Sequence, residues 1–143
     1  MNNTGRFPYQ IQSKYPHMKP ADILLWEKFV QLFTNEFDSV DFDVRVGEGI
    51  KMPEETPENM KLDAKVLTQK KIDVVGYNDD KITIIEVKPR AGTSALGQLI
   101  SYKTLYEKTY SPILPIEMLI ITDETDDDFT PIFEQNKIRI IKV

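Results

Sequence analysis

Apolar side chains recur every three or four positions across residues 20–37, a spacing that predicts an amphipathic helix. Its expected apolar stripe consists of Ile23, Trp26, Val30 and Phe33. Pro20 suits the first helical turn, where a backbone N–H has no intrahelical partner. Residues 39–46 then alternate apolar with polar side chains, which predicts a half-buried strand.

The pattern continues with two strands, at residues 71–77 and 81–88, joined by a short polar turn. A helix follows over residues 94–109, with Leu96, Leu99, Ile100, Tyr106 and Tyr110 as its expected buried side chains. The dense apolar run at 115–122 predicts a strand buried on both faces, and a last strand follows an acidic turn and a short helix. Because a helix between strands implies a parallel crossover, we expect a single α/β domain with a central mixed β-sheet of about five strands flanked by helices.

Two segments fall outside this pattern. Residues 1–19 are rich in Pro, Tyr and Asn and predict an N-terminal arm, packed through Phe7, Tyr9 and Tyr15, ahead of a domain at residues 20–143. Residues 47–68 combine Pro, Gly and acidic side chains, with a short strand expected near 62–67. A connection this long favours an insertion that acts as a lid or contacts the substrate.

Composition narrows the function classes. The chain has 143 residues, 41% hydrophobic and 29% charged, which excludes a wholly disordered protein. No apolar run approaches the ~20 residues needed to cross a bilayer, so we expect no membrane partner. The chain has no cysteine, which excludes disulfides, thiolate catalysis and zinc–cysteine sites. The first residues have no apolar signal-peptide segment, and this favours a cytoplasmic protein.

The net charge of −5 argues against non-specific nucleic-acid binding. The distribution of the charge weakens this argument, because residues 60–110 contain nine Lys and Arg but only six Asp and Glu. This stretch is therefore +3 and the remainder of the chain is −8. Ordinary scatter over the surface accounts for the surplus more simply than a functional basic face does.

The two central strands bring charged side chains together. If they form a hairpin with a two-residue or four-residue turn, Asp73 lies opposite Glu86, with Cβ atoms about 5 Å apart. The period of two puts Lys88 on the same face as Glu86. Two carboxylates this close repel unless a proton or a cation lies between them, and such oxygen ligands suit Mg²⁺ or Mn²⁺. The alternative is an ordinary surface pairing of acids with a lysine across two strands.

These residues resemble a known family. Asp73, then the run IIEVK with Glu86 and Lys88, then the run GQLISY with Gln98 and Tyr102, look like the core of the PD-(D/E)XK nuclease superfamily, the restriction-endonuclease-like nucleases. The resemblance covers residues 26–122. It implies a Mg²⁺-dependent hydrolase in which Asp73 and Glu86 bind the metal and Lys88 assists the attacking water. It also implies that the helix with Gln98 and Tyr102 lies over the active site.

The resemblance implies further contributors. The Val87 carbonyl would complete the metal ligands, and Glu27 matches a glutamate of the first helix that faces the metals in many members. Glu27 is equally well explained as a surface side chain whose carboxylate reaches solvent. Arg90 and Lys103 could contact substrate phosphates, although solvated surface positions explain them more simply.

The sequence thus predicts a metal-dependent nuclease that hydrolyses phosphodiester bonds in DNA, either as an endonuclease or as an exonuclease. A homodimer would suit concerted cutting of both strands. A first alternative is a catalytically silent nuclease-fold module, such as a phage or mobile-element structural or interaction protein. A second is an acidic protein that mimics DNA through the −8 outside the middle segment.

Overall fold

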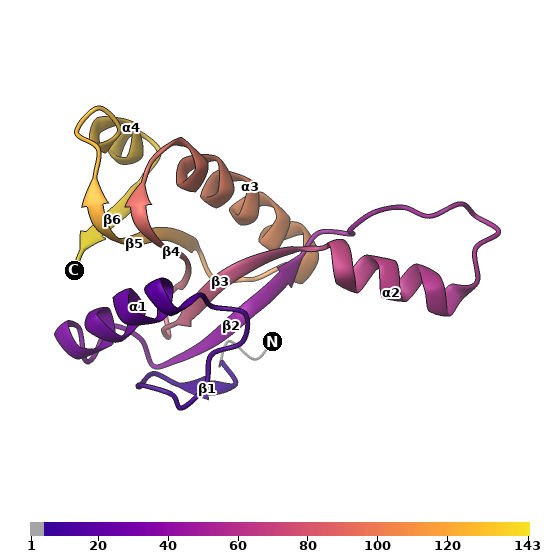
Figure 1. The fold of residues 1–143 in the computed structure, drawn as a ribbon, viewed down its shortest axis with the longest axis horizontal. Coiled ribbons are helices and arrows are strands. Elements are labelled where there is room, and N and C mark those ends of the chain that lie inside the picture. The colour runs from indigo at the N-terminus through magenta and orange to yellow at the C-terminus, as the bar shows by residue number, and fades with distance from the viewer. Residues whose placement is uncertain (1–4) are drawn as a thin grey trace.

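The computed structural model describes residues 5–143, so residues 1–4 of the predicted N-terminal arm lie outside the described residues (Figure 1). The strands are β1 (Phe7–Pro8), β2 (Ser39–Val46), β3 (Lys70–Tyr77), β4 (Ile82–Ala91), β5 (Ile116–Thr125) and β6 (Ile138–Lys142). The helices are α1 (Pro20–Leu32), α2 (Glu58–Thr68), α3 (Thr93–Tyr110) and α4 (Thr130–Gln135).

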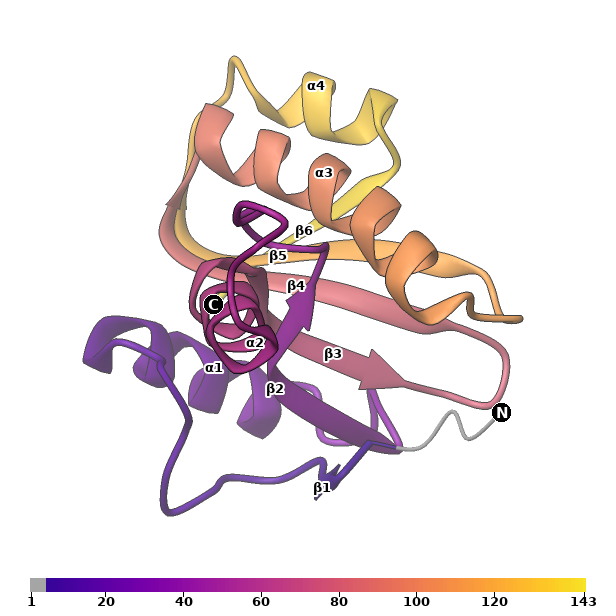
Figure 2. The ribbon, with the colours of Figure 1, turned by 90° about the vertical axis from the view of Figure 1, so that its right-hand side faces the viewer.

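All six strands form one mixed sheet in the order of the chain, β1-β2-β3-β4-β5-β6. Pairing is antiparallel from β1 to β4, and it is parallel from β4 to β6 because α3 and α4 carry the chain back across the sheet. Helix α1 lies on one face, and α3 and α4 cover the other (Figure 2). The predicted α/β domain with a mixed sheet is confirmed, with a sixth strand because Phe7–Pro8 of the N-terminal arm pairs with β2. Every helix among residues 5–143 is too short or too polar to span a bilayer.

Near the middle of β2 and β3, the alternating side chains switch from one face of the sheet to the other. The four apolar positions predicted for β2 are all buried, but Val40 and Phe42 pack on the α1 side while Val44 and Val46 pack on the α3 side. Asp43 between them has φ 53°, a left-handed conformation that interrupts the alternation. The β2–β3 register places Asp73 opposite this point, so the irregularity lies beside the predicted acidic pair.

The helical predictions need correction in detail. Helix α1 ends at Leu32 and buries Leu25, Trp26, Phe29 and Val30, whereas the predicted Ile23 and Phe33 are only half-buried. Helix α3 buries Ala95, Leu99 and Tyr106, while Ile100 and Tyr110 are exposed. In both helices the apolar stripe is rotated from the predicted one, because the angle at which a helix crosses the sheet decides which side chains touch it.

The strand predicted near residues 62–67 is wrong, because Glu58–Thr68 forms helix α2. The helix starts directly after Pro57, and Glu58 in its first turn is favourable at a helix N-terminus. It buries none of its residues and projects away from the sheet (Figure 1). The N-terminal arm, in contrast, packs as predicted, with Phe7, Tyr9 and Tyr15 against the apolar cluster on the α1 side.

Candidate active site

The β3–β4 hairpin opens at the end away from its turn, and we call the opening between Asp73 and Glu86 the fork. The strands pair from Tyr77 with Ile82 to Val74 with Ile85, which is the predicted register, and the Asn78 N–H donates to the Lys81 carbonyl (3.0 Å) to close a four-residue turn. The next register positions are Asp73 and Glu86, and there the backbone ladder stops.

A side chain takes over where the backbone pairing ends. The Val87 N–H of β4 donates to Asp73 Oδ2 (3.0 Å), so a carboxylate replaces the backbone carbonyl of β3 as the acceptor. In an antiparallel ladder the N–H and C=O of one residue point to the same neighbouring strand. If β4 keeps this geometry beyond the last backbone pair, we expect the Val87 carbonyl on the β3 side of the strand as well.

Asp73 and Glu86 face each other in this fork, as the hairpin register predicts. Burial is the main cause that raises both pKa values, to about 6 for Asp73 and to about 9 for Glu86. The Asp73 charge raises the pKa of Glu86 further, because two carboxylates this close repel each other. At neutral pH the pair therefore holds one proton.

One oxygen of this pair has no partner. Glu86 is only 3% exposed, and its Oε1 is buried without a hydrogen bond. Gln98 Oε1, on helix α3, is likewise buried and unpaired. Because a buried acceptor without a donor is costly, such atoms in a native structure are typical of places where an ion, water or substrate binds.

Lys88 supplies a positive charge beside the acids. It follows Glu86 by two residues on β4, is half-buried, and its charge lowers the pKa of both Asp73 and Glu86. Its Nζ donates to Ser94 Oγ (3.1 Å) in the first turn of α3, which fixes the direction of the lysine side chain. The structure therefore brings together the three charged residues that the hairpin predicted.

Helix α3 places Gln98 and Tyr102 on the side that faces the acids. Burial raises the pKa of the Tyr102 hydroxyl, and the charges of Glu86 and then Asp73 raise it further. A hydrogen bond from the Gln98 side chain acts in the opposite direction. A phenol whose pKa responds to both carboxylates lies close to them. Gln98 and Tyr102, one helical turn apart, therefore line the same site.

The acid that α1 brings toward the fork is Asp22 and not Glu27. The Asp22 charge raises the pKa of Asp73. Burial raises the pKa of Asp22 itself, and the charge of Lys88 lowers it. Glu27 instead accepts a hydrogen bond from the Tyr15 hydroxyl (3.1 Å) of the N-terminal arm. Sequence reasoning missed Asp22, although its spacing from Trp26 and Phe29 puts it on the buried stripe of α1.

The two basic residues predicted to contact substrate have neighbours other than the acidic pair. Arg90 is exposed, and its Nη1 lies 4.0 Å from Glu124 Oε2 on the neighbouring strand. Lys103 lines a separate surface hollow of about 500 Å³ together with Glu107 and Pro112. Neither is among the charges that shift the pKa values of Asp73 and Glu86.

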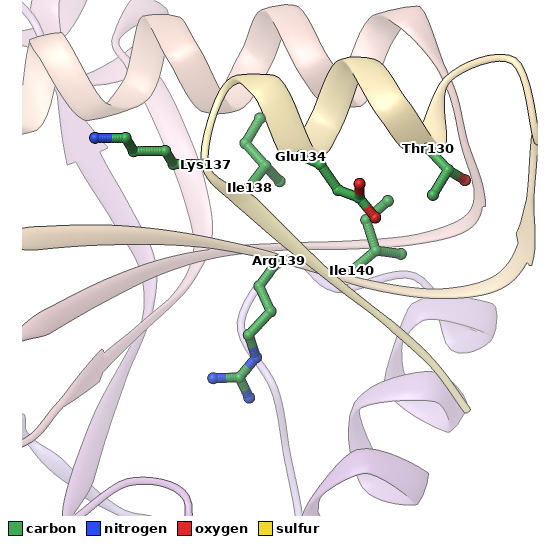
Figure 3. Close-up of a pocket in the computed structure, with 6 residues that line it drawn as sticks. All are labelled: Thr130, Glu134, Lys137, Ile138, Arg139 and Ile140. Carbon is green, nitrogen blue, oxygen red and sulfur yellow. The ribbon is translucent and has the colours of Figure 1, made fainter.

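Another hollow, of about 470 Å³, lies between α4 and β6 (Figure 3). Thr130, Glu134, Lys137, Ile138, Arg139 and Ile140 line it. Figure 3 shows that Lys137 and Arg139 extend in different directions, and Arg139 Nη2 lies 2.5 Å from Glu36 Oε1. These groups do not converge on one point, so the hollow is a weaker candidate site than the fork.

The fork offers a cation a limited set of ligands. Asp73 and Glu86 contribute carboxylate oxygens, of which Glu86 Oε1 is unpaired. The Val87 carbonyl is expected on the same edge of β4 as the Val87 N–H that donates to Asp73. Within residues 5–143, no group of three or more His, Asp or Glu side chains could hold a metal ion. A Mg²⁺ or Mn²⁺ ion would fit this donor set with water or phosphate oxygens at its remaining positions, as is usual for Mg²⁺.

Comparison of the chain with protein-family models, with curated proteins and with solved structures found no match. The assignment of the site therefore depends on its own geometry.

Proposed function

We propose that the protein is a metal-dependent nuclease that hydrolyses phosphodiester bonds in DNA. The observation that carries the proposal is the pair formed by half-buried Asp73 and buried Glu86, which has an unpaired Glu86 oxygen and lies beside Lys88. Such a pair is expensive to maintain in a sheet, and a divalent cation would relieve both the repulsion and the missing hydrogen bond.

In this proposal Asp73, Glu86 and the Val87 carbonyl would hold Mg²⁺ or Mn²⁺. The bound ion would polarise a phosphate oxygen and neutralise the charge that develops during hydrolysis. Lys88, held by Ser94, orients the attacking water or stabilises the negative charge on the phosphate.

The neighbouring side chains position the substrate and manage protons. Gln98 and Tyr102 lie on the α3 side of the acids, where an amide N–H and a hydroxyl can donate to a phosphate oxygen. The proton that Glu86 holds at neutral pH must leave before both carboxylates can bind a cation. Cation binding and proton release are therefore coupled at this site.

The resemblance to the PD-(D/E)XK nucleases supports the proposal. The hairpin with Asp73 and Glu86, the following helix α3 and the parallel strand β5 come in the order that this resemblance implies. A cytoplasmic location agrees with a DNA substrate.

A catalytically silent nuclease-fold module is the second candidate, and one observation favours it. The fork has two adjacent carboxylates rather than three, and Asp73 Oδ2 already accepts the Val87 N–H. In that case the protonated pair would serve only to join β3 to β4.

The test is incubation of the purified protein with linear, circular and branched DNA, with and without Mg²⁺ or Mn²⁺. We expect cleavage that requires the metal and is lost in the Asp73→Asn and Glu86→Gln variants, but is kept in Asp79→Asn, which changes an exposed acid of the same hairpin. Intact DNA under every condition, together with a melting temperature indifferent to metal, would favour the silent module.

A further inference from the structure

Two positively charged side chains, which we call the cationic pair, lie opposite each other on β2 and β3. The strand register pairs Arg45 with Lys71. Residues paired in this way carry their side chains on the same face of the sheet, with Cβ atoms about 5 Å apart. Like charges in this arrangement destabilise two neighbouring strands. The protein therefore holds two positive charges together where a pair of opposite charges would be more favourable.

The cationic pair has no acid to neutralise it within the described part of the chain. Among residues 5–143, neither Arg45 nor Lys71 forms an ion pair. Both side chains are half-buried, and Arg45 Nε is buried without a hydrogen-bond partner. A buried donor without an acceptor is costly, and such a group in a native structure is typical of a place where a ligand binds. The ligand that would satisfy two cations and an unpaired donor is an anion.

A ligand has access to the cationic pair from solvent. Val44 and Ile72, the residues before Arg45 and after Lys71, pack on the α3 side of the sheet, so alternation places the cationic pair on the opposite face. Helix α1 covers that face mainly over β4 and β5. The ends of β2 and β3 next to α2 extend beyond α1 (Figure 1).

The cationic pair also lies near the fork. Lys71 precedes Asp73 by two residues on β3, and a strand advances about 3.3 Å per residue, so the two positions are about 7 Å apart along the strand. Lys71 is not among the charges that shift the pKa of Asp73, which agrees with a position beside the acids rather than in contact with them. Each strand of DNA carries one phosphate per roughly 3.4 Å of helix axis. A strand with one phosphate at the fork therefore has another within reach of the cationic pair.

We propose that Arg45 and Lys71 bind a backbone phosphate of the DNA, one or two nucleotides from the phosphate that is hydrolysed. The choice of DNA as the ligand rests on the proposed function. Arginine offers a planar set of N–H donors that matches phosphate oxygens, and lysine adds a compact positive charge. Contacts to the backbone fix the position of the DNA but read no base, so this site confers no sequence preference.

The first test is fluorescence anisotropy of a labelled duplex oligonucleotide, without divalent metal so that the DNA stays intact. Arg45→Gln and Lys71→Gln should each weaken binding roughly five- to tenfold at 0.1 M salt and lower the slope of log affinity against log salt by about one. The matched control is Lys137→Gln, which removes an exposed positive charge before the edge strand β6 and should leave both quantities unchanged. A wild type that binds no DNA, or equal effects of all three substitutions, overturns the proposal.

A second variant, Lys71→Glu, separates loss of a phosphate contact from loss of structure. A glutamate opposite Arg45 makes a favourable cross-strand pair, so the melting temperature at low salt should rise by roughly 1–4 °C. DNA binding should weaken more than in Lys71→Gln, because the new charge repels phosphate. A more stable Lys71→Glu variant that binds DNA as tightly as the wild type contradicts the proposal.

These measurements distinguish failure of the phosphate site from failure of the proposed nuclease. If the wild type cleaves DNA while Arg45→Gln and Lys71→Gln bind it as tightly as Lys137→Gln, the phosphate site is wrong and the nuclease stands. If the wild type cleaves no DNA and the two substitutions still weaken binding selectively, the phosphate site stands and the nuclease is wrong.

Discussion

Two carboxylate sites on the central strands differ in how their oxygens are satisfied. Asp41 on β2 accepts three hydrogen bonds, from the Arg6 N–H (2.9 Å), from Arg6 Nε (3.2 Å) and from the Tyr77 hydroxyl (2.9 Å). Glu86 on β4 is more deeply buried, yet its Oε1 has no partner. One acid is surrounded by donors, and the other faces a second acid.

This difference separates a structural acid from a candidate functional one. Asp41 ties the N-terminal arm and β3 to β2, and its donors need nothing from outside the chain. Asp73 accepts the Val87 N–H, but Glu86 Oε1 accepts no hydrogen bond. Burial and mutual repulsion keep a proton between the two acids. The comparison predicts that changes at the fork alter activity more than stability, and that changes at Asp41 do the reverse.

The largest effect is expected for Glu86→Gln. A glutamine resembles the protonated carboxyl in shape but cannot carry the charge that holds a cation, so metal-dependent DNA cleavage should fall roughly 10³-fold. The melting temperature without metal should stay near that of the wild type, because the replaced group is already neutral at pH 7. Initial cleavage rates and thermal melts measure the two quantities.

The matched control for that variant is Glu124→Gln, an exposed acid on the neighbouring strand β5. It should change neither the cleavage rate nor the metal affinity. If Glu86→Gln cleaves DNA at the wild-type rate, the fork is not the active site, whatever activity the protein has.

The next effect concerns pH. The pKa values of about 6 for Asp73 and about 9 for Glu86 mean that the pair loses its last proton only above neutral pH. A cation must displace that proton, so Mg²⁺ or Mn²⁺ should bind more tightly as pH rises, by up to about tenfold per pH unit between these values. Calorimetry in buffers of different ionisation enthalpy counts the protons released. A metal affinity constant from pH 6 to pH 9 would contradict the coupling.

The opposite outcome is expected at Asp41. Its replacement by alanine leaves the Tyr77 hydroxyl, on a side chain that is only 8% exposed, without its acceptor and releases Arg6. Removing one partner of a buried hydrogen bond costs about 1–3 kcal/mol, so the free energy of unfolding should fall by that amount. Denaturant titration measures it, with Asp79→Ala in the exposed turn as the control. A loss of cleavage by folded Asp41→Ala would erase the distinction between the two sites.

Sequence reasoning predicted the fork well because it depends on local rules. A period of two and a symmetric turn set the register of β3 and β4, and the register alone places Asp73 opposite Glu86. The features that were missed depend on longer-range packing. Helix α2 was not predicted, because proline and acidic residues in this segment are typical of a loop. No periodicity rule predicts the left-handed conformation of Asp43, where the side chains of β2 switch faces of the sheet.

Long-range packing also explains why Glu27 was predicted on α1 where the structure has Asp22 near the fork. The smallest predicted effect concerns these two acids. The pattern places both acids near the apolar side of α1, but only the crossing of the helix over the sheet decides which one approaches the fork. Because the Asp22 charge raises the pKa of Asp73, Asp22→Asn should shift the pH dependence of metal binding to lower pH by a fraction of a unit. Glu27→Gln, which alters only the contact with Tyr15, should leave this pH dependence unchanged. Calorimetric titration of both variants across the same pH range makes the comparison, and a shift in Glu27→Gln alone would restore the original prediction for the first helix.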